Sequence, residues 1–297
     1  MPSLLSRLAP LVVTLRGSKR MFSSAQRTLD RVAKMQEKPA SFAPPSKLSR
    51  VASVTRRDVE GWPVYSVSPL DRAATKRVVY LHGGCYVFEI DPVHWALIGK
   101  LVAEAGVQVV VPIMPLAPVG TAEVVVPLVA DLVAALIAEV GAENVSVAGD
   151  SSGGGMALAV AMTLRDRELP PLHHLVLIAP WLDVSGTDPM LAQIAPHDPW
   201  LAVPGTRAAG GLYRDVLGEG DWRVSPIHGD LSGLGPITVF SGTRDIVHAD
   251  ALRFLPLAAE AGLAVDYHEG DGMIHNYPIL PMPEGDAARA VIVAAVR

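Results

Sequence analysis

The sequence is poor in cysteine and in uninterrupted hydrophobic runs. Cys85 is the only cysteine among 297 residues, so no intrachain disulfide can form and nothing in the chain calls for an oxidising compartment. We therefore expect a cytoplasmic protein. The apolar stretches at 107–118 and 124–140 are broken by Pro or acidic residues before they reach the roughly 20 residues that cross a bilayer. No membrane span is expected.

Excess positive charge is also lacking. The net charge is -5, and basic residues form no cluster beyond short pairs such as Arg56 and Arg57, so the chain carries no electrostatic footprint for nucleic acid. Metal-ligand spacing is missing as well, since no histidine stands in a His-x-x-x-His pattern with an intervening glutamate. We expect no nucleic-acid partner, no metal and no cofactor.

Hydrophobic residues make up half of the chain and charged residues only 19%, enough apolar material for one large domain with an appended cap. Nearly continuous apolar runs predict buried strands at 77–84, 107–114, 144–150, 174–181, 236–245 and 264–270. Helical patterns separate them at 91–105, 123–140, 153–168, 248–262 and 283–297, and two more polar strands are expected at 51–57 and 62–68. Strands buried on both faces indicate a mostly parallel sheet flanked by helices, an α/β fold.

Two regions interrupt this alternation. Residues 1–48 combine a helical pattern with a Pro-rich stretch, and 183–222 form a long insertion between two core strands. Ligands of an open parallel sheet lie at the carboxyl ends of its strands, so we expect both segments to fold over that edge as a helical cap on a catalytic domain spanning 49–297. The first 20 residues are interpreted as a cap helix, with a peripheral membrane anchor as the open alternative.

The most informative motif is Gly149-Asp-Ser151-Ser-Gly153, which joins a predicted strand to a predicted helix. A serine on such a sharp turn needs residues without side chains two positions before and after it, and both positions hold glycine. The turn exposes the serine hydroxyl beside the free amides of the helix. Ser151 is therefore the candidate nucleophile.

A serine nucleophile needs a base and a carboxylate that orients the base. Asp245 ends the strand at 236–245, and His275 lies in the loop after the next strand. Both positions fall at the sheet edge where Ser151 is expected. The order Ser, Asp, His along the chain is that of an α/β-hydrolase arrangement.

Other carboxylates and imidazoles lie near these positions. Asp250 falls in a helix start, where a capping or solvated role is favoured, and Glu269 and Asp271 precede the loop of the base. His268 alternates within a strand and is expected to be packed or on the surface.

The second half of an oxyanion hole is predicted at His82-Gly83-Gly84-Cys85, directly after a strand. Glycines let the backbone approach an ester carbonyl closely, and Ser152 would add another amide. We expect Cys85 to lie at the mouth of the pocket, with a buried, inert cysteine as the open alternative.

With these motifs in place, the chain resembles the hormone-sensitive-lipase-like esterases and lipases of the α/β-hydrolase fold. The resemblance covers roughly 50–297 and rests on His-Gly-Gly at 82–84, Leu-Ala-Pro at 116–118, Gly-Asp-Ser-Ser-Gly-Gly at 149–154 and Gly-Met-Ile-His at 272–275. It implies the triad Ser151, Asp245 and His275 and oxyanion amides on Gly84, Cys85 and Ser152. The third glycine of the family's His-Gly-Gly-Gly is Cys85 here. The family's late edge strand also implies a homodimer.

The sequence thus predicts a serine carboxylesterase that acts on small to medium acyl esters. An amidase or peptidase with the same triad remains an alternative, as does a non-catalytic ligand-binding protein of the same fold. Apolar cap residues, Trp200 and Tyr213 foremost, are expected to bind substrate, although the same residues could serve simply to seal the cap.

Overall fold

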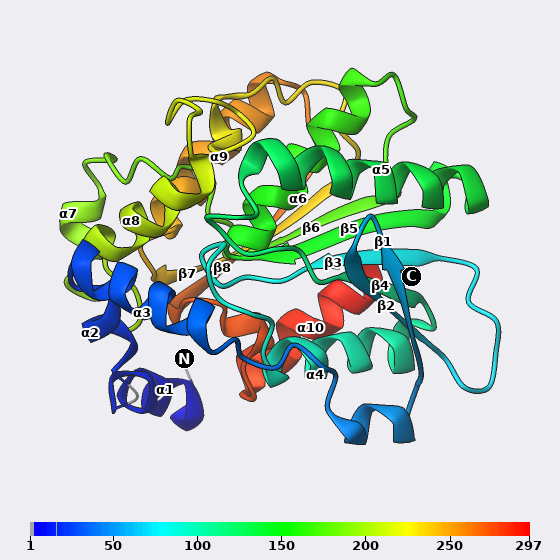
Figure 1. Cartoon of the computed structure of the whole chain (residues 1–297), viewed down its shortest axis with the longest axis horizontal. Helices are drawn as coiled ribbons and strands as arrows, with labels where there is room; N and C mark the ends of the chain where they lie inside the picture. The colour runs from blue at the N-terminus through cyan, green and yellow to red at the C-terminus, as the bar shows by residue number, and fades with distance from the viewer. Residues whose placement is uncertain (1–2, 16) are drawn as a thin grey trace.

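The computed structural model describes residues 3–15 and 17–297, and its centre is one eight-stranded sheet (Figure 1). The strand order is β1-β2-β4-β3-β5-β6-β7-β8, with β1 and β2 antiparallel and all later neighbours parallel. The bounds of the strands are β1 Ser53–Val59, β2 Trp62–Ser68, β3 Arg77–Leu81, β4 Gln108–Pro112, β5 Val145–Asp150, β6 His174–Ile178, β7 Ile237–Arg244 and β8 Val265–Ile274. The predicted α/β-hydrolase fold class is confirmed.

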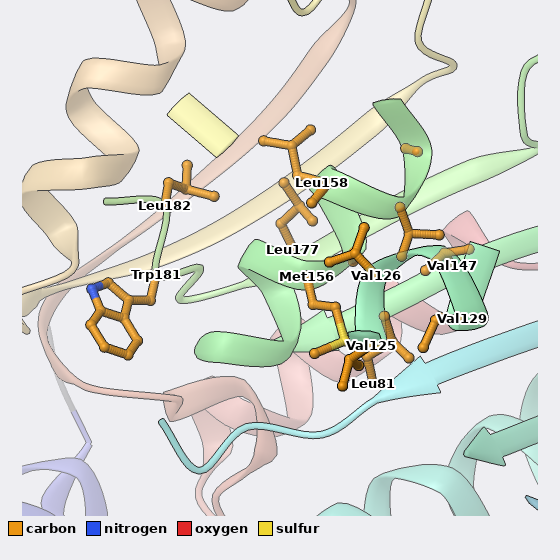
Figure 2. Packing of buried hydrophobic residues seen from close by; sticks show 14 of the residues in the cluster. Leu81, Val125, Val126, Val129, Val147, Met156, Leu158, Leu177, Trp181 and Leu182 are labelled. Carbon is orange, nitrogen blue, oxygen red and sulfur yellow. The ribbon is translucent and has the colours of Figure 1, made fainter. Parts of the chain in front are cut away.

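Two layers of helices cover the sheet because successive strand residues face opposite sides. Val79, Leu81 and Val147 join one core with the helices α5 (Ala122–Val140), α6 (Ser152–Asp166) and α9 (His248–Glu260). Figure 2 shows part of this packing, with Met156 of α6 beside Leu81 and Val125. Val78 and Tyr80 join the other core with α4 (Pro92–Lys100) and α10 (Pro283–Ala295). The apolar runs in the sequence therefore correspond to strands that are buried on both faces of the sheet.

Observed elements depart from the predicted ones mainly at their ends. The helix expected at 91–105 is α4 followed by a π-helical turn, Leu101–Ala105. The last strand continues four residues beyond its predicted end at 270, past an irregularity in its pairing with β7 between Gly242 and Arg244. This extension brings the chain directly to His275.

The segments outside the sheet lie against each other at one end of the molecule (Figure 1). The first contains α1 (Leu4–Leu15), α2 (Ser18–Phe22) and α3 (Ala25–Glu37), and the insertion after β6 contains α7 (Leu191–Ile194) and α8 (Val203–Arg214). Helices α2 and α3 cross α8 closely at Gly205, where a Cβ atom would lie 2.5 Å from the Cα of Phe22 and 2.4 Å from Oγ1 of Thr28. Lys19 Nζ donates to the carbonyl oxygens of Ala195 and Asp198, at 2.8 and 2.5 Å.

Within the described residues, we find no helix with the length and apolar character needed to cross a membrane.

Candidate active site

Ser151 stands on a strained turn between β5 and α6. Its φ of +53° lies in the left-handed region, which costs free energy in a residue with a side chain and is typical of functional turns. A Cβ atom on Gly149 would lie 2.2 Å from the carbonyl oxygen of Gly153, and one on Gly153 would lie 2.0 Å from that of Leu81. The turn therefore requires both glycines, for the reason that the sequence indicates.

The structure brings His275 and Asp245 together. His275 Nδ1 lies 2.7 Å from Asp245 Oδ2, and both side chains are buried. The amide of Val247 donates to the other carboxylate oxygen, Oδ1, at 3.1 Å. Burial opposes the charged imidazolium, but Asp245 outweighs it through charge and hydrogen bonding, so the pKa of His275 is raised.

The alternative acids and bases lie elsewhere. Asp250 is buried rather than solvated, and its Oδ2 accepts hydrogen bonds from the amides of Leu182 and Asp183 at 2.8 and 3.0 Å. Burial raises its pKa to about 8. His268 Nε2 contacts Asp266 Oδ2 at 2.8 Å, and its ring stacks on Phe240.

The loop after β3 presents free backbone amides, but not that of Gly83. Gly83 N donates to Asp150 Oδ1 at 3.0 Å, so the amide counted toward the oxyanion hole is already engaged. In the described part of the chain, the amides of Gly84, Cys85 and Ser152 have no acceptor. Gly84 and Cys85 hold φ values of +116° and +53°, which turn this loop sharply.

Cys85 lines the cavity, but its thiol is buried. Its side chain is only 3% exposed, and burial, together with the charge of Asp245, raises the pKa of the thiol to about 12. The expectation of an accessible thiol at the pocket mouth is corrected by this burial.

Ser151 and His275 line one cavity of about 170 Å³. Its walls come from the loop after β3, from α4, from α2 and from the insertion after β6, which contributes Trp200 and Leu201. The Trp200 ring meets the His275 ring edge-on, with centroids 5.7 Å apart.

Tyr213 is not among the residues of this wall. It is 1% exposed, and its ring stacks on Tyr86 with centroids 3.5 Å apart. Of the two predicted substrate-binding residues, the structure therefore brings only Trp200 to the cavity.

A wider and more open groove, about 580 Å³, runs beside β8 and α10. It is lined by His268, Glu269 and Asp271 but contains no serine, so it lacks a nucleophile next to its imidazole. The smaller cavity is lined by Ser151, by His275 and by Gly84 and Cys85, whose amides have no acceptor among the described residues. We therefore assign the candidate active site to it.

Asp150 is a buried residue whose importance sequence reasoning missed. Its carboxylate accepts hydrogen bonds from the Tyr80 hydroxyl (2.6 Å), Gly83 N (3.0 Å) and Asn276 Nδ2 (2.7 Å), and lies 3.3 Å from His94 Nε2. Burial disfavours both charges, but the ion pair outweighs it: the pKa of Asp150 is lowered and that of His94 is raised. One carboxylate thus fixes the oxyanion loop and the loop of the base.

Asp198 was also missed. It lies in the insertion, is 1% exposed, and accepts hydrogen bonds from the amides of Trp200 and Ile246 at 2.7 and 2.9 Å. Burial and the nearby Asp245 raise its pKa to about 6. Asp198 thereby ties the Trp200 wall to the loop that carries the acid.

No metal centre accompanies this site: across residues 3–15 and 17–297, no group of three or more His, Cys, Asp or Glu side chains is arranged to hold a metal ion.

Comparison with known proteins places these features in a family. Residues 78–279 match the model of an α/β-hydrolase-fold family. The chain is 31% identical to an esterase of Acinetobacter venetianus over 225 residues, 74% of each chain. It is 32% identical to a triacylglycerol lipase of Mycobacterium tuberculosis over 74% of its own length, but spans about half, 46%, of that lipase.

A solved structure supports the same family. A crystal structure of an esterase from the bacterial hormone-sensitive lipase family superposes with a TM-score of 0.76 at 27% identity, covering 91% of this chain and 97% of the other. These matches confirm the predicted resemblance and enzyme class. The chain belongs to the α/β-hydrolase fold family, in its hormone-sensitive-lipase-like group of ester hydrolases.

Proposed function

We propose that this protein is a serine carboxylesterase that hydrolyses small to medium acyl esters with the triad Ser151, Asp245 and His275. One observation carries the proposal. Ser151, held at positive φ, lines the same cavity as His275, and the Nδ1 atom of His275 lies 2.7 Å from the buried carboxylate of Asp245. A serine hydroxyl becomes a nucleophile when a histidine oriented in this way takes its proton.

In the proposed reaction, His275 Nε2 takes the Ser151 proton as Oγ attacks the ester carbonyl carbon. Asp245 accepts the Nδ1 hydrogen and stabilises the imidazolium. The tetrahedral intermediate collapses when His275 returns the proton to the alkoxy oxygen, which releases the alcohol and leaves Ser151 acylated. Water, deprotonated by His275, then attacks the acyl carbonyl. The second tetrahedral intermediate collapses when His275 gives this proton to Ser151 Oγ, which releases the acid and restores the serine hydroxyl.

The negative charge on the intermediate needs donors that are already in place. The unpaired amides of Gly84, Cys85 and Ser152 supply them, and the positive end of the α6 dipole lies at the same point. Removal of one such donor typically costs about 10²–10³ in kcat. A side chain at position 85 leaves its backbone amide available.

The size and walls of the cavity support the substrate class. A volume of about 170 Å³, with Phe22, Phe88, Trp200 and Leu201 in its lining, suits a modest apolar acyl or alcohol group. Glu89 is the exception, because its Oε2 is buried and has no hydrogen-bond partner among the described residues. We therefore expect esters with an added carboxylate to be rejected.

We further propose that 1–48 and 183–222 act as a cap on the catalytic domain. α2 and the insertion both line the cavity, and Lys19 links them. In this role they select substrates, whereas the sheet edge carries out the chemistry.

Two other functions fit the same fold. An amidase or peptidase would use the same triad, and a non-catalytic binding protein would use only the cavity. The presence of both His275 and three unpaired amides favours turnover over binding alone.

The test is hydrolysis of p-nitrophenyl esters of increasing acyl length beside a p-nitroanilide of one short acid. We expect ester turnover, highest for short to medium chains, and a burst of p-nitrophenol when acylation is the faster step. Ser151→Ala should lower turnover by at least about a thousandfold. Ser146→Ala, at a buried serine on β5, the strand that leads to Ser151, is the matched control and should retain activity. Faster anilide than ester cleavage would favour the amidase, and no turnover of either would favour the binding protein.

A further inference from the structure

Helix α1 carries an exposed apolar face. Leu4, Leu8, Leu11 and Leu15 are 73%, 46%, 57% and 78% exposed. At 100° per residue they fall within one arc of the helix, which also includes the exposed Leu5 and Val12. A helix on a globular protein normally turns this face toward the core.

Specific polar contacts hold the opposite face of α1 against the protein. The hydroxyl of Ser3 donates to Glu284 Oε2 at 2.8 Å and that of Ser6 donates to Glu284 Oε1 at 3.0 Å, where Glu284 begins α10. Ser6, Pro10 and Val13 are the buried residues of the helix. The orientation with leucines outward is therefore fixed by hydrogen bonds that the reverse orientation would break.

Positive charge is concentrated in the N-terminal segment that contains this face. Residues 1–38 contain eight Lys or Arg and two Asp or Glu, a net charge of +6, on a chain whose total is -5. Arg7, Arg27, Arg31 and Lys34 are exposed, and none of them forms an ion pair with a described residue. Arg27, Arg31 and Lys34 recur at intervals of four and three and so share one face of α3.

Helix α2 connects the active-site cavity to α1 and α3. Ser18, Met21 and Phe22 of α2 line the cavity, and α2 contacts both α1 and α3 (Figure 1). A surface that held α1 would therefore lie next to a helix that forms part of the cavity wall.

We propose that α1, α2 and α3 form a docking surface for an anionic phospholipid membrane. The outward leucines of α1 enter the boundary between headgroups and acyl chains, and the basic residues contact lipid phosphates, the combination by which short amphipathic helices bind membranes. Charge complementarity favours a lipid surface over a symmetric pair of copies joined through α1, because such a pair would bring the two positive segments together. The inference does not depend on the esterase proposal, since docking is measured without an ester.

The experiment is flotation of the full chain with vesicles of phosphatidylcholine alone or with about 30% phosphatidylglycerol. We expect the protein to float with the anionic vesicles, weakly with the neutral ones, and less as salt rises. Leu8→Asp with Leu11→Asp should lower the partition coefficient about tenfold or more. Leu70→Asp, at an equally exposed leucine (62%) in the loop after β2, is the matched control and should float like wild type.

A charge variant, Arg27→Gln with Arg31→Gln and Lys34→Gln, should lose binding to anionic vesicles and most of the salt dependence. Thermal unfolding should match wild type in every variant, which separates loss of docking from loss of fold. Turnover of a soluble short ester should match as well, because none of the substituted residues lines the cavity. Absence of wild-type flotation, or equal flotation of the leucine variant, overturns the proposal. So does a leucine variant that only converts a dimer to a monomer by light scattering, because α1 would then be a contact between copies.

Discussion

Replacing Asp245 by Asn should abolish turnover through the tautomer of His275. In the structure, Val247 N donates to Asp245 Oδ1 while His275 Nδ1 meets Oδ2. An asparagine would keep its oxygen on the Val247 amide and turn its NH₂ group toward Nδ1. That nitrogen must then accept, so the proton moves to Nε2, which can no longer take the proton of Ser151.

The size of the effect follows from this geometry. The variant loses a buried, charge-assisted hydrogen bond and also holds the base in the unreactive tautomer, so we expect a loss of about 10⁴ in kcat, the scale of the same lesion in a well-studied serine protease. This corresponds to about 5.5 kcal/mol of activation free energy. KM should change little, because Asp245 is not among the residues that line the cavity.

Asp250→Asn is the matched control. It is another buried aspartate near the same loop, but its Oδ2 accepts only from the backbone amides of Leu182 and Asp183, which an asparagine oxygen can also satisfy. Its kcat should stay within about threefold of wild type. Initial rates on a p-nitrophenyl ester at saturating concentration measure both variants. Near-normal activity of Asp245→Asn with loss in Asp250→Asn would refute the assignment of the acid.

Three further measurements test the site. The neutral form of His275 is needed as a base and its pKa is raised, so kcat/KM should fall as pH drops through a value above 6.5, and an acid limb at or below 6.5 would contradict this. A bulky maleimide should leave Cys85 unlabelled in the folded protein and label it in denaturant, whereas rapid labelling of the native protein would disprove its burial. Trp200→Ala should change kcat/KM unevenly across acyl lengths, by roughly tenfold to two-hundredfold, while Tyr213→Phe should leave the acyl preference unchanged; equal losses on every ester would remove Trp200 from the pocket.

The fold could be predicted because its strands are buried on both faces. Runs such as 77–81 and 145–150 are mostly apolar, without the regular alternation of apolar and polar residues that a half-exposed strand shows. The ends of helices and strands were less predictable. At 91–105, for example, the helical sequence pattern continues although the backbone changes to a π-helical turn after Lys100. The outward leucines of α1 could not be foreseen, since hydrophobic periodicity reports a face but not the side it points to.

The candidate site could be predicted where local geometry dictates residue type. Gly149 and Gly153 are required by backbone contacts within a few residues of Ser151, so the motif itself carries the information. The role of Asp150 depends on Tyr80, His94 and Asn276, which are brought together only by the folded sheet. The place of Tyr213 could not be predicted either. An aromatic side chain is equally suited to a pocket wall and to the buried stack on Tyr86 that Tyr213 forms.

The shared carboxylate of Asp150 has a consequence for how the enzyme could change. A substitution that shifts the loop at Gly83 also displaces Asn276, since both hydrogen-bond the same side chain. Mutations in either loop are therefore expected to be epistatic with one another, even when the altered residues never touch. Substitutions that adapt the enzyme to new esters should be tolerated better in α2 and in the insertion at Trp200. Residues of both segments line the cavity but form no hydrogen bond with Asp150. Diversity among descendants of this sequence should concentrate there.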